Sequence, residues 1–496
     1  MAEIKIIRNI ELTLDGNQNK FFPSMCKLCI LLILLMLLSN FRIYNSDHKI
    51  NYFHFSQKDY IKLIQQSDIQ EIISYISSIP KENDLNTQSI LNIQKKTRTS
   101  LFPWRGQFSP QLIEYILKEN TQPGYCILDP FCGSGTTLYE SARLNLSCYG
   151  IDINPAAHLF SSIINFCSLN KMERENILTK VCNLAHKNIG WQENTGLFAL
   201  LYPNKGILTE QLLNFYQDCQ KSYFTYLIAT ISIMIAMSNS ENTTAQKFFK
   251  SLNTVLEIIK TLPYTHIPLS SLLSDARYLN LPPSSFDLIV TSPPYINVFN
   301  YHQNYRKALE FLNWQPLQVA VSEIGANRKH RVNRFLTVIQ YCMDMCMVFI
   351  EMRQVLHQKG KVIIVVGRTS SVRGVNFQNS YLLAMVATGC AGLKIEKWQE
   401  RCFTNRFGEK IYEDILTLSI SLQPDCDYLK LARSIGIWSL KNAICQNQEV
   451  KKDIEQAINY ADKVVVSPKL NLEIPPIYDT LYKSFCSQQE KLVSKV

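Results

Sequence analysis

The 496-residue sequence has no apolar run long enough to cross a bilayer. Its unbroken run, Leu28–Leu38, is about half the roughly 20 residues that a membrane-spanning helix needs. A mixed-charge start and the lack of a clear cleavage site also disfavour a signal peptide. Three interpretations stay open: a buried helix, an interfacial anchor, or a start codon assigned upstream of the natural one. We expect a soluble, cytoplasmic protein that does not use a membrane as a partner.

Regular cysteine spacing is also missing. The 15 cysteines are scattered, which suits a reducing compartment better than a disulfide framework. Cys26 and Cys29 have a metal-like spacing, but no second pair follows at a ligating distance. Cys342 and Cys346 lie one helical turn apart among apolar residues and indicate a packed helix face. We therefore expect no metal site.

Internal repeats and low-complexity tracts are absent, and the composition is that of a globular protein. With 46% hydrophobic and 19% charged residues, the chain can form two or three well-packed domains. The formal net charge of +10 favours an anionic partner such as nucleic acid. An excess this small also fits a soluble basic protein, so it supports such a partner without establishing one.

Apolar periodicity divides the chain into helical and mixed segments. Helical spacing dominates near the N-terminus and again in the middle, whereas strands, turns and helices alternate in two other stretches. We expect a helical region with the apolar run at 1–100, the two halves of an α/β core at 101–166 and 271–424, a helical insertion at 167–270, and a mixed region at 425–496.

The two halves of the core carry the expected strands. The first half predicts a strand, helix and strand at Cys126–Leu128, about Thr136–Leu144 and Ser147–Ile151, with a glycine-rich loop after the first strand. The second half predicts a strand at Phe286–Val290, a helix around Phe335–Leu356, and strands at Val362–Val366 and Ile415–Ile420.

The glycine-rich loop, Asp129–Thr137, reads DPFCGSGTT. Glycine lets the backbone come close to a ligand, and open parallel sheets bind ligands at the carboxyl ends of their strands. The loop matches neither the G-x-G-x-x-G fingerprint nor a P-loop. Asp152 ends the next strand, where a carboxylate can accept both hydroxyls of a ribose. We therefore expect a nucleotide-like cofactor here.

A second motif, Thr291–Tyr295, reads TSPPY and follows the strand Phe286–Val290. Two prolines end a strand abruptly, and a turn is the simplest interpretation. The combination with the glycine-rich loop is more specific. DPFCGSGTT resembles the cofactor loop of the amino-methylating DNA methyltransferases, and TSPPY resembles their catalytic motif.

The flanking stretches agree with this resemblance, which covers roughly Leu101–Ala157 and Ser271–Ile420. They read FPWRGQFSPQLIEYIL, TSPPYINVFNYHQNYRKALEFL and EMRQVLHQKGKVIIVVG. The resemblance implies a Rossmann-like α/β fold with a mostly parallel, seven-stranded sheet, and S-adenosyl-L-methionine as cofactor. It makes 101–166 the cofactor-binding half and 271–424 the catalytic half.

The resemblance also implies roles for individual residues. Asp152 would hold the ribose and Asp275 would accept from the adenine amine, although Asp275 also fits a helix cap or a turn. Phe108 would wall the methionine end, although it also fits plain core packing. The expected cofactor-binding set is Phe108, Pro110, Asp129, Phe131, Gly133, Gly135, Thr136, Asp152 and Asp275.

The expected catalytic set is Ser292, Pro293, Pro294 and Tyr295. The amine of a base is a weak nucleophile because its lone pair is delocalised into the ring. The Ser292 hydroxyl and the Pro293 carbonyl can accept hydrogen bonds from that amine, and the prolines preorganise the carbonyl. Tyr295 would stack on the base, which must leave the duplex to reach the site.

Two departures from the family pattern matter. The cofactor loop precedes the catalytic motif, which is a permuted order, and the insertion has no counterpart in the core fold. We expect the insertion, as a target-recognition segment, or the C-terminal 70 residues to contact DNA. The basic cluster Arg328, Lys329, Arg331 and Arg334 fits either phosphate binding or a solvated surface.

The leading interpretation is a site-specific DNA methyltransferase, with DNA as partner and a cognate restriction endonuclease as an optional one. Ser292 at the head of the motif resembles the cytosine-N4 enzymes more than the adenine-N6 enzymes. Ring-carbon methylation needs a thiolate from a Pro-Cys dipeptide, which this sequence lacks. The alternatives are an adenine-N6 DNA methyltransferase, an RNA guanine-N2 methyltransferase and a non-catalytic DNA-binding protein.

Overall fold

The computed structural model describes residues 57–93, 97–190, 209–238, 243–297, 299–326, 330–404, 408–422 and 426–493. The chain divides into two compact units, Met1–Ile64 and Gln65–Val496. Within the first unit, the described residues 57–64 are helical. The second unit holds the sheet and the site. The predicted apolar run and the Cys26 and Cys29 pair lie outside the described residues, as do Arg328 and Lys329.

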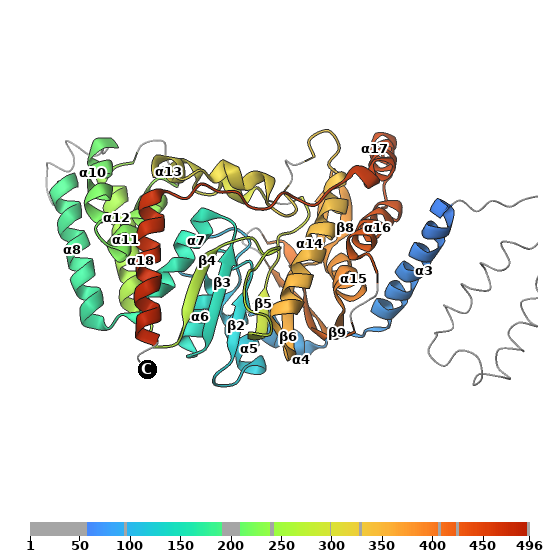
Figure 1. Cartoon of the computed structure of the whole chain (residues 1–496), viewed down its shortest axis with the longest axis horizontal. Coiled ribbons are helices and arrows are strands. Elements are labelled where there is room, and N and C mark those ends of the chain that lie inside the picture. The colour runs from blue at the N-terminus through green and yellow to red at the C-terminus, as the bar shows by residue number, and fades with distance from the viewer. Residues whose placement is uncertain are drawn as a thin grey trace, which may run out of the picture. The chain divides into compact units, whose positions relative to one another are not determined.

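An eight-stranded sheet forms the centre of the second unit (Figure 1). In spatial order its strands are β1 (Lys81–Glu82), β9 (Leu393–Thr404), β10 (Lys410–Ile420), β6 (Leu356–Gly367), β5 (Phe286–Thr291), β2 (Cys126–Asp129), β3 (Ser147–Asp152) and β4 (Leu269–Leu273). β10 is antiparallel to both of its neighbours, and the other pairs are parallel.

The predicted α/β fold with a mostly parallel sheet is confirmed. The sheet has one strand more than the seven expected, because the two-residue β1 pairs with the outer edge of β9. The predicted strands at Cys126, Ser147 and Phe286 are β2, β3 and β5. β4 and β9 were not predicted, and β6 begins six residues before the predicted Val362.

Helices cover both faces of the sheet, because successive strand residues point to opposite sides. In β5, Leu288 and Val290 join one hydrophobic core and Ile289 joins the other. The first core includes α5 (Pro110–Asn120) and α6 (Thr136–Arg143). The second includes α14 (Leu336–Val355), α15 (Asn379–Ala391) and α16 (Tyr428–Lys441).

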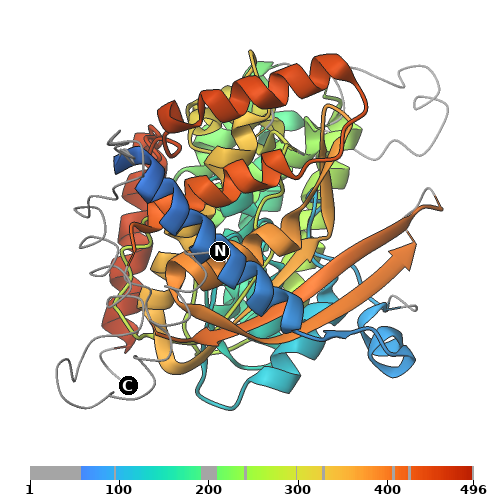
Figure 2. The same cartoon turned by 90° about the vertical axis from the view of Figure 1, so that its right-hand side faces the viewer.

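α14 corresponds to the helix predicted around Phe335–Leu356. Its residues Cys342 and Cys346 are fully buried, so the predicted packed helix face is confirmed. The neighbouring connections carry the other short elements, α4 (Leu85–Leu91), α7 (Pro155–Ser161), α13 (Arg306–Phe311), α17 (Gln448–Asn459), β7 (Thr369–Val372) and β8 (Val375–Gln378). Figure 2 shows the long β9–β10 hairpin in orange.

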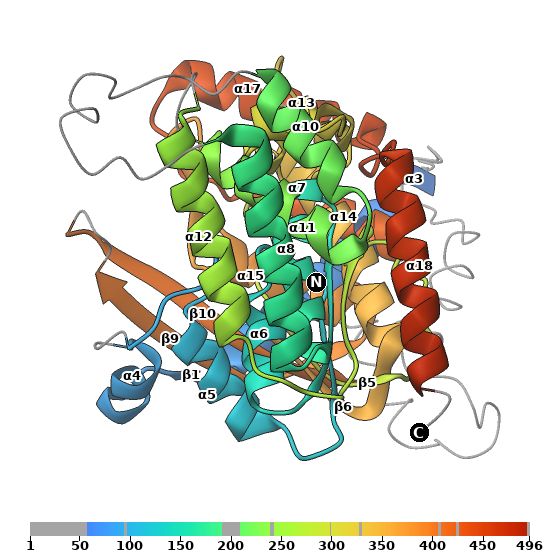
Figure 3. The same ribbon diagram turned by 90° about the vertical axis from the view of Figure 1, so that its left-hand side faces the viewer.

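The chain between β3 and β4 contains a helical layer (Figure 3). Its described helices are α8 (Lys171–Ile189), α10 (Thr209–Cys219), α11 (Tyr223–Ala236) and α12 (Ala245–Thr261). α8 begins with a capping box in which the Asn170 side chain accepts from the Glu173 backbone while the Glu173 side chain accepts from the Asn170 backbone. α11 is buried along nearly all of its length, and its apolar residues belong to the first hydrophobic core.

The C-terminal segment crosses the molecule to reach this layer. After α17 the chain runs to α18 (Pro476–Val493), drawn in red in Figure 1, which contacts α11. The ring of Phe485 stacks on Tyr223 of α11, with centroids 4.6 Å apart. Among the described helices, none is both long and apolar enough to cross a membrane.

Candidate active site

The predicted motifs meet at one edge of the sheet. β2 and β5 are adjacent and parallel, and the chain visits β3 and β4 on one side before it crosses to β5 and β6 on the other. The boundary between β2 and β5 is therefore a topological switch point, where open α/β sheets bind ligands. The glycine-rich loop follows β2, and Ser292 follows β5.

Asp129, the last residue of β2, connects the two motifs. Its buried carboxylate accepts hydrogen bonds from the Thr137 hydroxyl at 2.5 Å, the Thr291 hydroxyl at 2.7 Å and the Phe131 backbone N–H at 3.1 Å. Burial raises the pKa of Asp129 to about 6, although these donors oppose the shift. Asp129 does not line either cavity described below, and its predicted contact with a cofactor remains a prediction.

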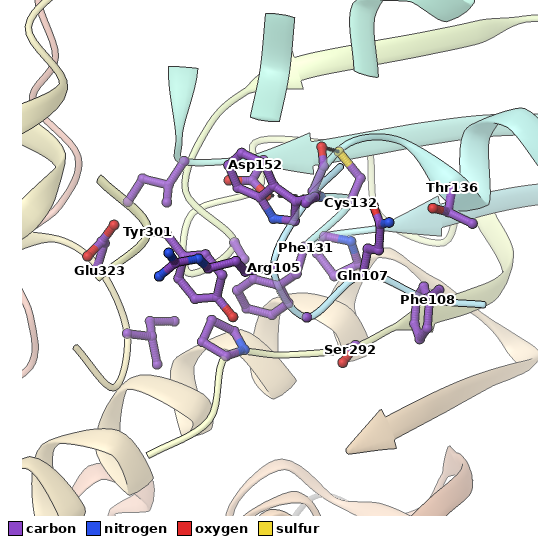
Figure 4. Close-up of a pocket in the computed structure, with 18 of the residues that line it drawn as sticks. Arg105, Gln107, Phe108, Phe131, Cys132, Thr136, Asp152, Ser292, Tyr301 and Glu323 are labelled. Carbon is purple, nitrogen blue, oxygen red and sulfur yellow. Dashed lines mark hydrogen bonds between the residues drawn. The ribbon is translucent and has the colours of Figure 1, made fainter. Parts of the chain in front are cut away.

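A cavity lies in front of the switch point (Figure 4). Predicted residues that line it are Phe108, Phe131, Gly133, Thr136, Asp152, Asp275, Ser292 and Pro294. The wall is largely apolar, with a few carboxylates and backbone groups. This composition fits a ligand that has both an apolar ring and polar groups.

Asp152 is held at the floor of this cavity by two backbone donors. Its carboxylate accepts from the Asn154 N–H at 2.8 Å and the Gly133 N–H at 3.0 Å. Burial raises the pKa of Asp152 to about 7, and the two N–H groups oppose that shift. The carboxylate thus retains lone pairs toward the cavity while its orientation is fixed.

The two glycines of the loop differ in what they do. Gly133 lines the cavity with φ +53°, and a Cβ there would lie 3.0 Å from the ring of Trp104. Gly135 has φ +89°, and a Cβ there would lie 3.0 Å from the backbone of Ser161. Gly135 therefore permits tight packing at the start of α6, and its predicted contact with a cofactor remains a prediction.

Asp275 lines the cavity, but its carboxylate is engaged inside the fold. One oxygen accepts from the backbone and Nε of Arg277, and the other accepts from Nη2 of Arg277 and the Leu470 N–H. Buried Arg277 also donates to Asp344 and to the Ser467 carbonyl. These contacts fix the carboxylate of Asp275 in the fold, and its predicted bond to an adenine amine remains a prediction.

Several lining residues have no counterpart in the predicted set. They are Trp104, Arg105, Gly106, Gln107, Pro130, Cys132, Ile153, Ala276, Tyr301, Ser322, Glu323 and Ile324. Trp104 and Tyr301 stack with centroids 6.2 Å apart, and both lie in stretches that carried the resemblance. Glu323 pairs with the buried His302 at 2.7 Å and follows no strand, so no local signal marks it.

A second cavity lies beside the first. The two share Gly106, Gln107, Phe108 and Ser292, and the second one is also lined by Pro110 and by residues of β9 and β10. Phe108 lines both cavities and packs against the first core, so its two interpretations are compatible. Pro110 lines the second cavity but not the first, so it does not share a cavity with Gly133 and Asp152 of the predicted cofactor-binding set.

The Ser292–Tyr295 loop is held from several sides. The Pro294 carbonyl accepts from the Tyr341 hydroxyl at 3.0 Å. The Tyr295 ring lies against Gly367, where a Cβ would come within 2.9 Å of it. Within the described residues, the Pro293 carbonyl accepts no hydrogen bond. Tyr295 lines neither cavity, so its predicted stacking on a base remains a prediction.

Fold and site together define an α/β protein with a ligand cavity at the switch point of a mostly parallel sheet. Residues 36–162 match the family model N6_N4_Mtase, described as DNA methylase. This range contains the glycine-rich loop but not Ser292–Tyr295. The sequence is also similar to two type II methyltransferases, described next. Parts of the chain are thus similar to DNA methylases and to type II methyltransferases.

The first relative is the type II methyltransferase M.MjaII of Methanocaldococcus jannaschii, which is 33% identical over 108 residues, or 21% of this chain and 20% of the relative. The second is the type II methyltransferase M.BsoBI of Geobacillus stearothermophilus, which is 23% identical over 318 residues, or 52% of this chain and 61% of the relative. The chain thus spans less than two thirds of each.

Solved methyltransferase structures align over larger parts of the chain with low scores. A SAM-dependent methyltransferase from Methanosarcina mazei is 12% identical, covers 62% of this chain and 98% of its own, and has a TM-score of 0.28. An rRNA methyltransferase from Streptomyces viridochromogenes is 13% identical, covers 68% and 94%, and has a TM-score of 0.25. Scores this low support no argument about the function of this chain.

The first cavity fits S-adenosyl-L-methionine, the cofactor that the sequence predicts. Gly133 leaves the backbone of the loop open toward the cavity, and Asp152 presents oriented carboxylate oxygens. Phe131 and Ile153 supply apolar walls of the kind that an adenine ring requires.

Proposed function

We propose that this chain is a DNA methyltransferase that transfers a methyl group from S-adenosyl-L-methionine to the exocyclic amine of a base, with cytosine N4 as the target. One observation carries the proposal: the glycine-rich loop and the Ser292 motif end adjacent parallel strands and are joined through Asp129. A methyl donor on the first motif and an acceptor amine on the second would thus meet at the boundary between the two cavities.

On the donor side, we assign binding to the residues of the first cavity. Asp152 would accept hydrogen bonds from the ribose hydroxyls, while Gly133 allows close approach of the loop backbone. Phe131 and Phe108 would enclose the apolar parts, and Thr136 would contribute a hydroxyl at the start of α6. The bound cofactor supplies an electrophilic methyl group on a sulfonium.

On the acceptor side, Ser292 lines both cavities and is therefore placed to contact an amine that enters from the second. The Ser292 hydroxyl and the Pro293 carbonyl would accept the two N–H groups of that amine and draw electron density toward its nitrogen. The Tyr341 bond to the next carbonyl, that of Pro294, holds the loop so that these acceptors need no rearrangement.

The target must reach the second cavity, and a base inside a duplex cannot, so we propose that the base is flipped out of the helix. DNA is accordingly the proposed partner. The type II relatives favour a restriction–modification system with a cognate endonuclease. The helical layer and the C-terminal segment remain the proposed DNA-contacting parts, and they pack on each other through α11 and α18.

The deciding experiment incubates the purified full chain with cofactor and DNA, digests the DNA to nucleosides and weighs them. N4-methylcytosine supports the proposal in full. N6-methyladenine would keep the mechanism but correct the base, and methylation of RNA alone would favour the guanine-N2 alternative. Cofactor binding without any methylated product would favour a non-catalytic DNA-binding protein.

A further inference from the structure

The second cavity has a charged wall that the sequence motifs do not explain. Arg401 of β9 and Glu413 of β10 line it together with Ser292. The two are direct cross-strand partners in the antiparallel ladder. Glu413 in turn pairs with Gly367 of β6, against which the Tyr295 ring lies. The sheet thus brings this pair beside the catalytic motif, more than 100 residues away in sequence.

Arg401 is a buried cation. Its side chain belongs to a residue only 5% exposed, and its nearest carboxylate oxygen, on Glu413, is 3.5 Å from Nε. Among the residues that the structure describes, Nε of Arg401 has no hydrogen-bond partner. The guanidinium lies over the ring of Phe403, with 4.8 Å from Cζ to the centroid, which keeps its plane in place.

Such an arrangement is costly unless a ligand completes it. A charged donor loses its hydrogen bonds to water when it is buried. Without an acceptor in the protein, that cost in free energy is not compensated. Burial lowers the pKa of Arg401 and raises the pKa of Glu413, in line with this cost. The cavity in front of Arg401 is the place from which an acceptor can come.

We propose that Arg401 donates hydrogen bonds to N3 and O2 of the flipped cytosine and so selects cytosine over adenine. The inference rests on the proposed function and deepens it. On the Watson–Crick edge, cytosine presents two neighbouring acceptors, N3 and O2, after its amine. Adenine presents only N1 on that edge, followed by the C2–H group. The forked donors of arginine match two neighbouring acceptors, so one of them would stay unpaired against adenine.

The test measures coupling between Arg401 and the N3 atom. Single-molecule sequencing of host DNA first identifies the target position. The kcat/KM of the wild type and of Arg401→Met is then measured on duplexes that carry cytosine or 3-deazacytosine at that position. The analogue replaces N3 by C–H and keeps the amine. We expect the Arg401→Met substitution alone, or the analogue alone, to reduce kcat/KM on the order of tenfold to a hundredfold. The variant acting on the analogue should lose little more than either change alone. Multiplicative losses would overturn the proposal.

Lys397→Met serves as the matched control. Lys397 lies on the same strand, pairs with Glu82 at 3.0 Å on the exposed side, and lines neither cavity. It should leave both the reaction and its response to the analogue unchanged. Calorimetry should show unchanged cofactor affinity in Arg401→Met, which a general loss of structure would not allow.

Two further readouts keep the outcomes separate. If the product is N4-methylcytosine but Arg401 and N3 are not coupled, only the role of Arg401 is overturned. If the product is N6-methyladenine, both the choice of cytosine and the role of Arg401 are overturned. If Arg401→Met fails to fold, Arg401→Lys replaces it, because a single ammonium keeps the charge but not the fork. Equal rates of the wild type on cytosine and on the analogue would overturn the inference without any variant.

Discussion

The hydroxyl of Thr291 donates a hydrogen bond to the carboxylate of Asp129 across 2.7 Å, although 161 residues separate them. Thr291 ends the strand before the catalytic motif, and Asp129 ends the strand before the cofactor loop. The bond therefore sets the distance between the two halves of the proposed site.

We predict that Thr291→Val loosens this junction. Valine keeps the shape but removes a donor from a buried carboxylate, which costs about 1–3 kcal/mol. Denaturant unfolding should show that loss of stability, and turnover should fall more than cofactor affinity because the cofactor cavity does not include Thr291. Equal stability of the two proteins would show that Asp129 is satisfied without Thr291.

A second prediction concerns the glycine-rich loop. Gly133→Asp should abolish cofactor binding in calorimetry, because its Cβ would press on Trp104 and its carboxylate would repel the carboxylate of the ligand. Gly124→Asp is the matched control, since Gly124 also has positive φ, at +90°, but nothing lies within 4 Å of its Cβ position. Equal affinity in both variants would remove the loop from the site.

The third prediction is a pH dependence of cofactor binding. The folded pKa of Asp152, at about 7, lies above its ordinary value of 3.8, so the carboxyl is protonated below neutral pH and ionised above it. If the ionised form accepts the ribose hydroxyls, affinity should rise as pH increases through about 7 and should be flat in Asp152→Asn. Asp129→Asn should keep the dependence, since Asp129 does not line the cavity.

The same shift predicts how stability changes with pH. Because the folded state holds the proton more strongly, the contribution of Asp152 is fully present below about pH 3.8 and is lost as pH rises toward 7. Asp152→Asn should therefore gain stability relative to the wild type as pH rises through this window. Unfolding curves at several pH values measure it, and parallel curves for the two proteins would contradict the shift.

The fourth prediction separates catalysis from cofactor binding. Ser292→Ala removes one proposed acceptor for the amine, so kcat should fall at least tenfold while cofactor affinity stays the same. Ser285→Ala, on the turn before the same strand, is the control, because its hydroxyl donates to the Pro283 carbonyl and lines neither cavity. Rapid-quench kinetics with saturating cofactor measures the difference. A matching loss in both variants would point to a disturbed strand instead.

Local sequence patterns are enough to predict the parts of the site that follow strand ends. DPFCGSGTT and TSPPY are local signals, and each follows an apolar strand whose pattern is also local. Carboxyl ends of parallel strands share one edge, so two such motifs predict one cavity without any knowledge of the connections. Phe131, Gly133, Asp152 and Ser292 line that cavity for this reason.

Which residues face the cavity and which stabilise the fold depends on contacts between distant parts of the chain. The carboxylate of Asp275 accepts hydrogen bonds from Arg277. The Arg277 guanidinium is held in turn by the carbonyl of Ser467, 190 positions later in the chain. Gly135 faces Ser161, and Asp129 faces Thr291, through contacts that no local pattern records. Arg401 and Glu413 meet across a ladder whose register is set by the pairing of β9 with β10. Long-range packing places these groups, and a motif describes only its own neighbours in the chain.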